Sequence, residues 1–110
     1  MRRTLEQTRL LLALVALLAF VLVAQPTRAA DGKAVFDKTC ALCHGNGLAG
    51  APRFGNAGEW TARIAQGVPK LYESAIRGTA KGMPGRGGNP ALSDDDVKAA
   101  VDYMAAAVSK

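Results

Sequence analysis

Hydrophobic positions divide the chain into an apolar N-terminal stretch and a longer part in which short amphipathic segments alternate with glycine-rich loops. Residues 10–24 form one uninterrupted apolar run, LLLALVALLAFVLVA, after a basic start that includes Arg2 and Arg3. Such a run is shorter than the roughly 20 residues that a membrane-spanning helix usually needs. With the small residues that follow it, the run predicts a signal peptide cleaved after Ala29, or alternatively after Ala30. An uncleaved membrane anchor is the other interpretation.

The clearest helical pattern lies near the C-terminus. Ser93 is a good N-cap, and the acidic residues 94–96 would lie at the positive end of the helix dipole. Apolar residues then recur at the spacing of one helix face, namely Val97, Ala100, Val101, Met104 and Val108. The acidic triplet is also open to interpretation as a docking patch, but capping explains it without a partner.

Three further helices are predicted before this one. The first covers residues 32–40, the second covers residues 59–66 and ends at Gly67, and the third covers residues 69–77 and ends at Gly78. No segment alternates convincingly between apolar and polar residues, as a half-buried strand would. The expected fold class is therefore all-α, with four short helices.

Candidate chemistry is concentrated in the pentapeptide Cys40-Ala-Leu-Cys43-His44. Two thiols at this spacing can each form a thioether with one vinyl group of a haem, and the adjoining imidazole can then bind the iron as the proximal ligand. A structural zinc site needs four ligands, whereas the whole chain has two cysteines and one histidine. A thioredoxin-like disulfide needs a strand and helix context that is missing here. The motif therefore predicts one covalently attached haem c.

A second axial ligand for the iron is found by elimination. No second histidine exists, so Met83 and Met104 remain once Met1 has left with the leader. Met104 belongs to the apolar face of the last helix, where methionine ordinarily serves packing. Met83 lies in a polar loop rich in glycine and proline, where an apolar side chain has no helix face to fill. We therefore predict His44 and Met83 as the two axial ligands.

Charge and size change when residues 1–29 are set aside. The chain has 14 basic and 9 acidic residues, and the leader holds four of the former and one of the latter. Residues 30–110, predicted as a single mono-haem domain, thus carry a net charge of only +2, which gives no support for nucleic-acid binding. A domain of this size is marginal for a self-sufficient core. We therefore expect a buried porphyrin to complete the core and the haem-free chain to be largely unfolded.

Several segments in a fixed order resemble the class I c-type cytochromes, and most closely the cytochrome c5 group. They are Gly32 to Phe36 before the haem motif, Gly50-Ala51-Pro52, Trp60 with Arg63, Met83-Pro84, and Ala99 to Met104. The resemblance implies a small class I fold whose four helices surround one haem and whose first and last helices cross. It also implies that the Pro52 carbonyl accepts a hydrogen bond from His44. Trp60 and Arg63 are candidates for hydrogen bonds to a haem propionate.

The function expected from these residues is one-electron transport in the periplasm as part of a respiratory chain. With both axial positions filled, no open site is left for a substrate, so we expect a carrier and not an enzyme. Expected partners are a redox-protein donor and acceptor, such as membrane respiratory complexes, with no nucleic acid and no small-molecule substrate. Membrane attachment would occur only through an uncleaved leader. The alternatives are a haem c subunit of a periplasmic oxidoreductase complex and a haem-based ligand sensor with a labile Met83.

Docking to acidic partners is a further possibility raised by the basic residues. A basic rim is one interpretation of six of them, namely Arg53, Arg63, Lys70, Arg77, Lys81 and Arg86. The other interpretation is that these charges are scattered and serve solubility.

Overall fold

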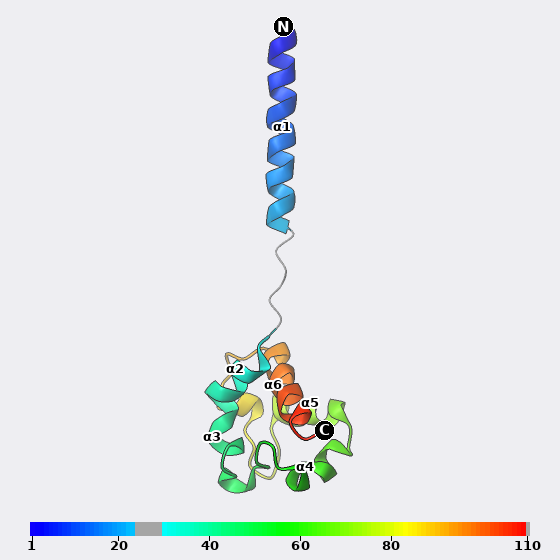
Figure 1. Cartoon of the computed structure of the whole chain (residues 1–110). Coiled ribbons are helices and arrows are strands. Elements are labelled where there is room, and N and C mark those ends of the chain that lie inside the picture. The colour runs from blue at the N-terminus through cyan, green and yellow to red at the C-terminus, as the bar shows by residue number, and fades with distance from the viewer. Residues whose placement is uncertain (24–29, 110) are drawn as a thin grey trace.

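The N-terminal apolar stretch is helical. The computed structural model describes residues 1–23 and 30–109, with side-chain surroundings for residues 1–17 and 30–109. Helix α1 (Arg2–Val23) covers most of the predicted leader, whereas the expected cleavage position after Ala29 lies outside the described residues (Figure 1). Within the described residues, no helix combines the length and the apolar character that crossing a membrane requires.

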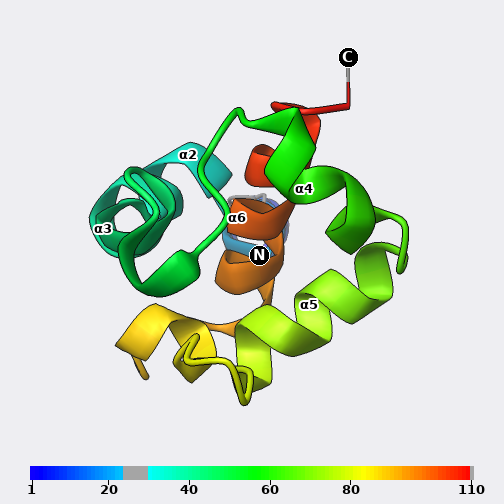
Figure 2. The same ribbon diagram turned by 90° about the horizontal axis from the view of Figure 1, so that it is seen from below.

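The rest of the described chain, residues 30–109, is built from helices and turns without a strand. Its elements are α2 (Gly32–Val35), the π-helical segment η1 (Phe36–Cys40), α3 (Ala41–His44), the 3-10 turn η2 (Leu48–Gly50), α4 (Ala57–Ile64), α5 (Val68–Arg77), the 3-10 turn η3 (Gly85–Gly88) and α6 (Asp94–Ala106). Figure 2 shows α3, α4 and α5 arranged around α6, which lies at the centre of that view. The expected all-α fold is confirmed.

The first helix of this domain continues four residues beyond its predicted end at Cys40. Segments α2, η1 and α3 follow one another without a break from Gly32 to His44. The Asp31 side chain caps the start, and a wider π turn joins the parts because the Ala41 N–H donates to the Phe36 carbonyl. Single π turns inside helices occur often at functional sites. Here the turn brings the whole haem motif onto a helix.

Helices α2 and α6 cross at very close range. A Cβ atom on Gly32 would lie 2.1 Å from the carbonyl oxygen of Ala99 in α6. Phe36 and Tyr103 meet beside this crossing with ring centroids 5.5 Å apart, and Phe54 stacks on Tyr103 at 5.1 Å. The absence of a side chain at Gly32 therefore sets the distance between the two helices, as the resemblance implies.

Capping explains where the later helices begin. Helix α4 starts at Ala57, two residues earlier than predicted, because the Asn56 side chain accepts a hydrogen bond from the Glu59 N–H. Ser93 caps α6 as predicted, and its partner in a reciprocal capping box is Asp96. The acidic first turn of α6 thus has a structural role within the chain.

Two small apolar clusters form the core of the described domain. One contains Phe36, Trp60 and Met104, and the other contains Ala75, Val97 and Val101. These buried side chains come from α4, α5, α6 and the π-helical segment, so the core depends on helices distant in sequence. Two clusters of this size give little apolar burial for a domain of about 80 residues. This agrees with the expectation that the haem completes the core.

The turn before Pro52 contains a residue in an unfavourable conformation. Ala49 has a φ of 54°, a left-handed conformation that glycine adopts readily and alanine does not. We expect Ala49→Gly to raise the free energy of unfolding by about 1 kcal/mol. Ala51→Gly is the matched control, because Ala51 has extended backbone with a φ of −61° and its replacement should destabilise slightly. Denaturant unfolding of the holoprotein tests this, and equal effects of the two substitutions would contradict it.

Candidate haem site

The three residues of the haem motif lie on one face of a helix. Cys40 ends η1, and Cys43 and His44 end α3. Positions three and four residues apart lie above one another on a helix, so both thiols and the imidazole project to the same side. Both cysteines are half-buried, and they are not joined in a disulfide. Burial raises the pKa of the Cys40 thiol, and the neighbouring Cys43 adds to the effect.

His44 is buried and held in one orientation. Its side chain is only 7 % exposed, and its Nδ1 lies 2.8 Å from the Pro52 carbonyl oxygen. Because a carbonyl can only accept, Nδ1 is the donor of this hydrogen bond, and in the neutral ring Nε2 is the nitrogen that keeps a lone pair. The ring also stacks on Trp60, with centroids 5.7 Å apart. The imidazole is thus fixed with Nε2 in the form that binds a metal.

The donor set fits iron in a porphyrin and not a bare metal ion. Among the residues described, no three side chains of His, Cys, Asp or Glu come together to hold a metal. A porphyrin supplies its own ring nitrogens and needs only axial ligands from the protein. His44 offers one such ligand, and the two thiols beside it offer the points of covalent attachment. The residues present therefore fit haem c.

Met83 lies in a loop that is tied at its start to the end of α5. The Thr79 N–H donates to the Met83 carbonyl at 2.9 Å, and the Met83 N–H donates to Thr79 Oγ1 at 3.3 Å. An antiparallel bridge between Gly78 and Pro84 extends this pairing. The Met83 side chain is half-buried and packs on the cluster around Ala75. The Met83 backbone is therefore fixed while its side chain remains partly accessible.

The two methionines that were compared from the sequence have different surroundings. Met104 is 3 % exposed and packs between Phe36 and Trp60, so its side chain is used in the core. Met83 belongs to the other cluster, away from the one that includes Trp60, the stacking partner of His44.

Trp60 and Arg63 have partners within the protein. The Trp60 indole N–H donates to the Arg53 carbonyl at 2.8 Å, so its single donor has a backbone partner in this structure. The propionate contact of Trp60 stays a prediction. Arg63 Nη1 donates to the Glu59 carbonyl at 2.6 Å, which leaves the other guanidinium N–H groups of Arg63 for that role.

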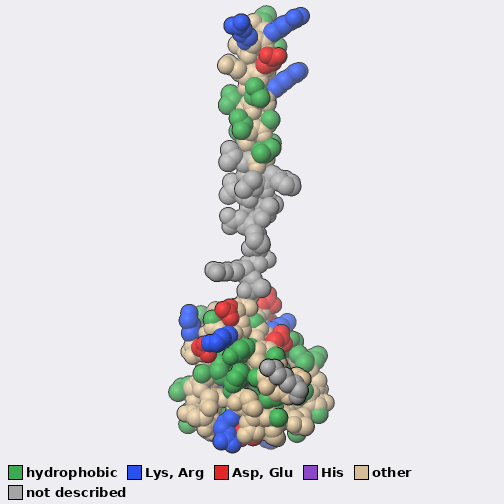
Figure 3. Space-filling view, viewed as in Figure 1, with side chains coloured by type: hydrophobic (Ala, Val, Ile, Leu, Met, Phe, Trp, Pro, Cys, Tyr) green, Lys and Arg blue, Asp and Glu red, His purple; other side chains and the backbone are tan. Residues whose placement is uncertain are grey.

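Basic side chains do not form a continuous free rim. Half of the six candidates are in ion pairs: Arg53 with Glu59 at 3.0 Å, Lys70 with Glu73 at 3.2 Å, and Arg86 with Asp94 at 2.5 Å. Acidic and basic side chains are intermixed near the top of the domain in Figure 3 and are not segregated by sign. These observations favour the scattered distribution of charge.

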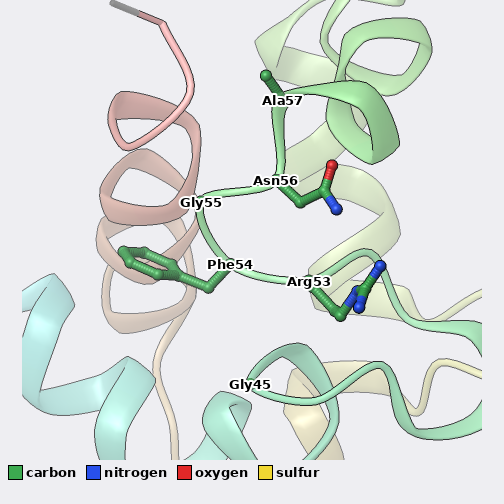
Figure 4. A pocket seen from close by; sticks show the side chains of 6 residues that line it. All are labelled: Gly45, Arg53, Phe54, Gly55, Asn56 and Ala57. Atoms are coloured by element: carbon green, nitrogen blue, oxygen red, sulfur yellow. The ribbon is translucent and has the colours of Figure 1, made fainter.

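An open surface pocket is lined in part by Gly45, the residue that directly follows the haem motif. It is lined by Gly45, Arg53, Phe54, Gly55, Asn56 and Ala57 (Figure 4). The Phe54 ring points away from the Arg53 and Asn56 side chains in this view and packs on Phe36 and Tyr103. The Arg53 side chain donates a hydrogen bond to the Glu59 carboxylate, which lowers the pKa of Glu59. The same bond ties this loop to α4. The lining residues include none of the predicted haem ligands, so the pocket borders the site and is not its centre.

Three contributors to the site were not found from the sequence. Phe54 completes the aromatic contact at the crossing of α2 and α6, Thr79 holds the backbone of Met83, and Arg86 pairs with Asp94. Only Arg86 carried a recognisable signal, as a charged residue within a glycine-rich loop. The other two depend on contacts that sequence spacing does not specify.

The fold and the site together define a small c-type cytochrome. Residues 27–104 match the family model described as "Cytochrome C oxidase, cbb3-type, subunit III". The chain therefore belongs to the cytochrome c family, as a class I c-type cytochrome with covalently bound haem c.

Curated relatives and solved structures support this assignment. The chain is 44% identical over 82 residues to cytochrome c-555 of Prosthecochloris aestuarii, covering 68% of this chain and 83% of the relative. It is 36% identical over 78 residues to cytochrome c5 of Azotobacter vinelandii, covering 69% and 93%. The expected similarity to cytochrome c5 is confirmed, and the identity to this cytochrome c-555 is higher.

A solved structure extends the comparison to the fold. It is titled "Crystal structure of electron transfer complex of nitrite reductase with cytochrome c", with a TM-score of 0.66 and 34% identity. The match covers 76% of this chain and 99% of that chain. The relatives are small electron-carrier cytochromes, so electron transport is the class of function that the comparisons support.

Proposed function

We propose that this protein is a periplasmic one-electron carrier that holds haem c through Cys40 and Cys43, with His44 and Met83 as axial ligands. The observation that carries the proposal is the placement of His44, which is buried and whose Nδ1 lies 2.8 Å from the Pro52 carbonyl oxygen, so that Nε2 is the nitrogen available to the iron. When bound, the haem supplies an iron that changes between the ferrous and ferric states. The protein contributes attachment, ligand geometry and a largely apolar surrounding.

Each of these residues has one task. Cys40 and Cys43 attach the macrocycle on the side of the helix where His44 lies. The Pro52 carbonyl orients the imidazole and raises its basicity. The Met83 thioether, a soft ligand, favours the reduced state and raises the reduction potential. Since both axial positions are then filled, the proposed role is a carrier and not an enzyme.

Partners and compartment follow from the same proposal. Residues 1–29 act as a cleaved signal peptide for residues 30–110, and small c-type cytochromes typically work in the periplasm or outside the cell. The partners are redox proteins, a donor and an acceptor, among them membrane respiratory complexes. Support comes from the solved neighbour, whose title describes a cytochrome c in an electron-transfer complex with nitrite reductase.

Axial ligation by Met83 is tested by replacing each methionine with leucine. We expect the ferric wild type to show the weak near-red charge-transfer band of methionine ligation, and Met83→Leu to remove it. Met83→Leu should also lower the reduction potential by on the order of 0.1 V, within the roughly 0.8 V range that axial ligands control. Absorption spectroscopy and a redox titration measure both effects.

Met104→Leu is the matched control for this experiment. Met104 is buried in the core, so leucine should keep the band and cost under about 1.5 kcal/mol of stability. A band that survives Met83→Leu, or disappears in Met104→Leu, would contradict ligation by Met83. A high-spin spectrum in the wild type would instead support the ligand-sensor alternative.

A second candidate function is a haem c subunit of a periplasmic oxidoreductase complex. The observation that favours it is the matching family model, whose description names an oxidase subunit. Purification from the native membrane distinguishes the two functions. A subunit would copurify in fixed stoichiometry with its complex, whereas a carrier would be released as a single protein.

A further inference from the structure

Arg86 lies in the Met83 loop with a backbone conformation that arginine rarely adopts. Its φ is 56°, and Gly87 beside it has a φ of 62°. The left-handed conformation is unfavourable in free energy for any residue that has a side chain, whereas glycine adopts it without this cost. Strain of this kind persists where surrounding contacts hold it, and it concentrates at functional sites. The Arg86 side chain provides such contacts.

The guanidinium of Arg86 joins the Met83 loop to the start of α6 at two points. Nη1 donates to the Leu92 carbonyl at 3.0 Å, and Nη2 donates to Asp94 Oδ1 at 2.5 Å. The Arg86 side chain is 29% exposed and that of Asp94 is 58% exposed, so only the Arg86 side of the ion pair is partly shielded from water. A planar guanidinium can engage two acceptors at once in fixed geometry, which an ammonium group does less well. We call these two hydrogen bonds the Arg86 clamp.

The clamped loop is also in close contact with the helix that bears the haem motif. A Cβ atom on Gly87 would lie 2.8 Å from Cγ2 of Thr39, the residue before Cys40. A Cβ atom on Gly85 would lie 2.9 Å from the carbonyl oxygen of Ile76 in α5. The loop therefore has little freedom between η1 and α5, and the clamp fixes its remaining side to α6.

We propose that Arg86 is a positioning residue for the Met83 ligand. The loop that carries Met83 is held before this residue by Thr79 and after it by the Arg86 clamp. Without the clamp, the second half of the loop is free to move away from α6 and to carry the thioether with it. This inference rests on the proposed function, because it assumes that Met83 binds the iron.

A loosened ligand is replaced more easily by an external one. Imidazole added to the ferric holoprotein competes with a methionine ligand, and its binding is seen as loss of the near-red band. The apparent affinity for imidazole therefore reports how firmly the protein holds its own ligand. Global stability is measured separately by denaturant unfolding, so a change in ligand exchange is distinguished from general destabilisation.

The experiment compares two neighbouring aspartates in the first turn of α6. Asp94→Ala removes one acceptor of the clamp, whereas Asp95→Ala removes a charge in the same turn that has no bond to Arg86. We expect Asp94→Ala to raise the apparent imidazole affinity about fivefold, as loss of a partly exposed charged hydrogen bond implies. Asp95→Ala should stay within about twofold of the wild type. Arg86→Lys, which keeps the charge but not the fork, should fall between these values.

The outcomes separate this inference from the function on which it rests. If the wild type lacks the near-red band, or Met83→Leu keeps it, the proposed ligation fails. If the band behaves as proposed but Asp94→Ala and Asp95→Ala bind imidazole equally, only the role of Arg86 is overturned. It is also overturned if the affinity change merely follows the loss of global stability across all three variants. A selective change in Asp94→Ala, with an intermediate value in Arg86→Lys, supports it.

Discussion

Gly32→Ala is expected to cost the domain about 3 kcal/mol or more, which is a large part of the stability of a typical small domain. The added Cβ would lie 2.1 Å from the Ala99 carbonyl oxygen and 2.7 Å from its carbon. Both are backbone atoms of α6, so no side-chain rotation relieves the overlap and the two helices must move apart. Yield of folded holoprotein and thermal unfolding measure the effect.

Gly58→Ala is the matched control, because Gly58 also lies in a helix. A Cβ atom there would meet nothing closer than Asn56 Oδ1 at 3.4 Å. Alanine is the better helix former by nearly 1 kcal/mol, so this variant should be as stable as the wild type or more so. If both variants unfolded at the same temperature, the crossing of α2 and α6 would not depend on Gly32 as argued.

Removing both thiols is expected to produce a colourless and largely unfolded chain. Cys40→Ala combined with Cys43→Ala deletes the points of haem attachment, and the remaining core consists of two small clusters. Domains of this size rarely gain more than a few kcal/mol from such a core, so they depend on an added staple. Far-ultraviolet circular dichroism should show little helix and no cooperative thermal transition.

Leu42→Ala provides the comparison for this experiment. Leu42 lies between the two cysteines and is 73% exposed, so its truncation should leave haem attachment and stability nearly unchanged. A double cysteine variant with native-like helicity and a cooperative transition would show that the polypeptide folds without its cofactor.

The parts of the fold that were predicted correctly are those encoded by local pattern. Ser93 and the apolar face that follows it define α6, because capping and periodicity act within a few residues. The first helix was predicted too short, since a π turn shifts the hydrogen bonding of Ala41 to Phe36 without a local sequence sign. The start of α4 was missed because Asn56 was not recognised as its cap.

The site shows the same division between local and distant information. Cys40, Cys43 and His44 lie within five consecutive residues, so their chemistry is visible in the sequence. The bond of the Trp60 indole to the Arg53 carbonyl was not found from the sequence, because it depends on how a loop folds back over α4. The Arg86 clamp includes a bond between a loop residue and Asp94 of α6. The sequence pattern of neither the loop nor the helix indicates this contact.

The bond between His44 and Pro52 has a consequence for the speed of electron exchange in the proposed carrier. The Pro52 ring prevents rotation about φ at this residue. The backbone that carries the carbonyl bonded to Nδ1 therefore has one rotation fewer than at other residues. Trp60 stacks on the imidazole ring and so restrains the tilt of the ring plane. If His44 binds the iron as proposed, its imidazole would keep one orientation in both oxidation states, and a small reorganisation energy would follow.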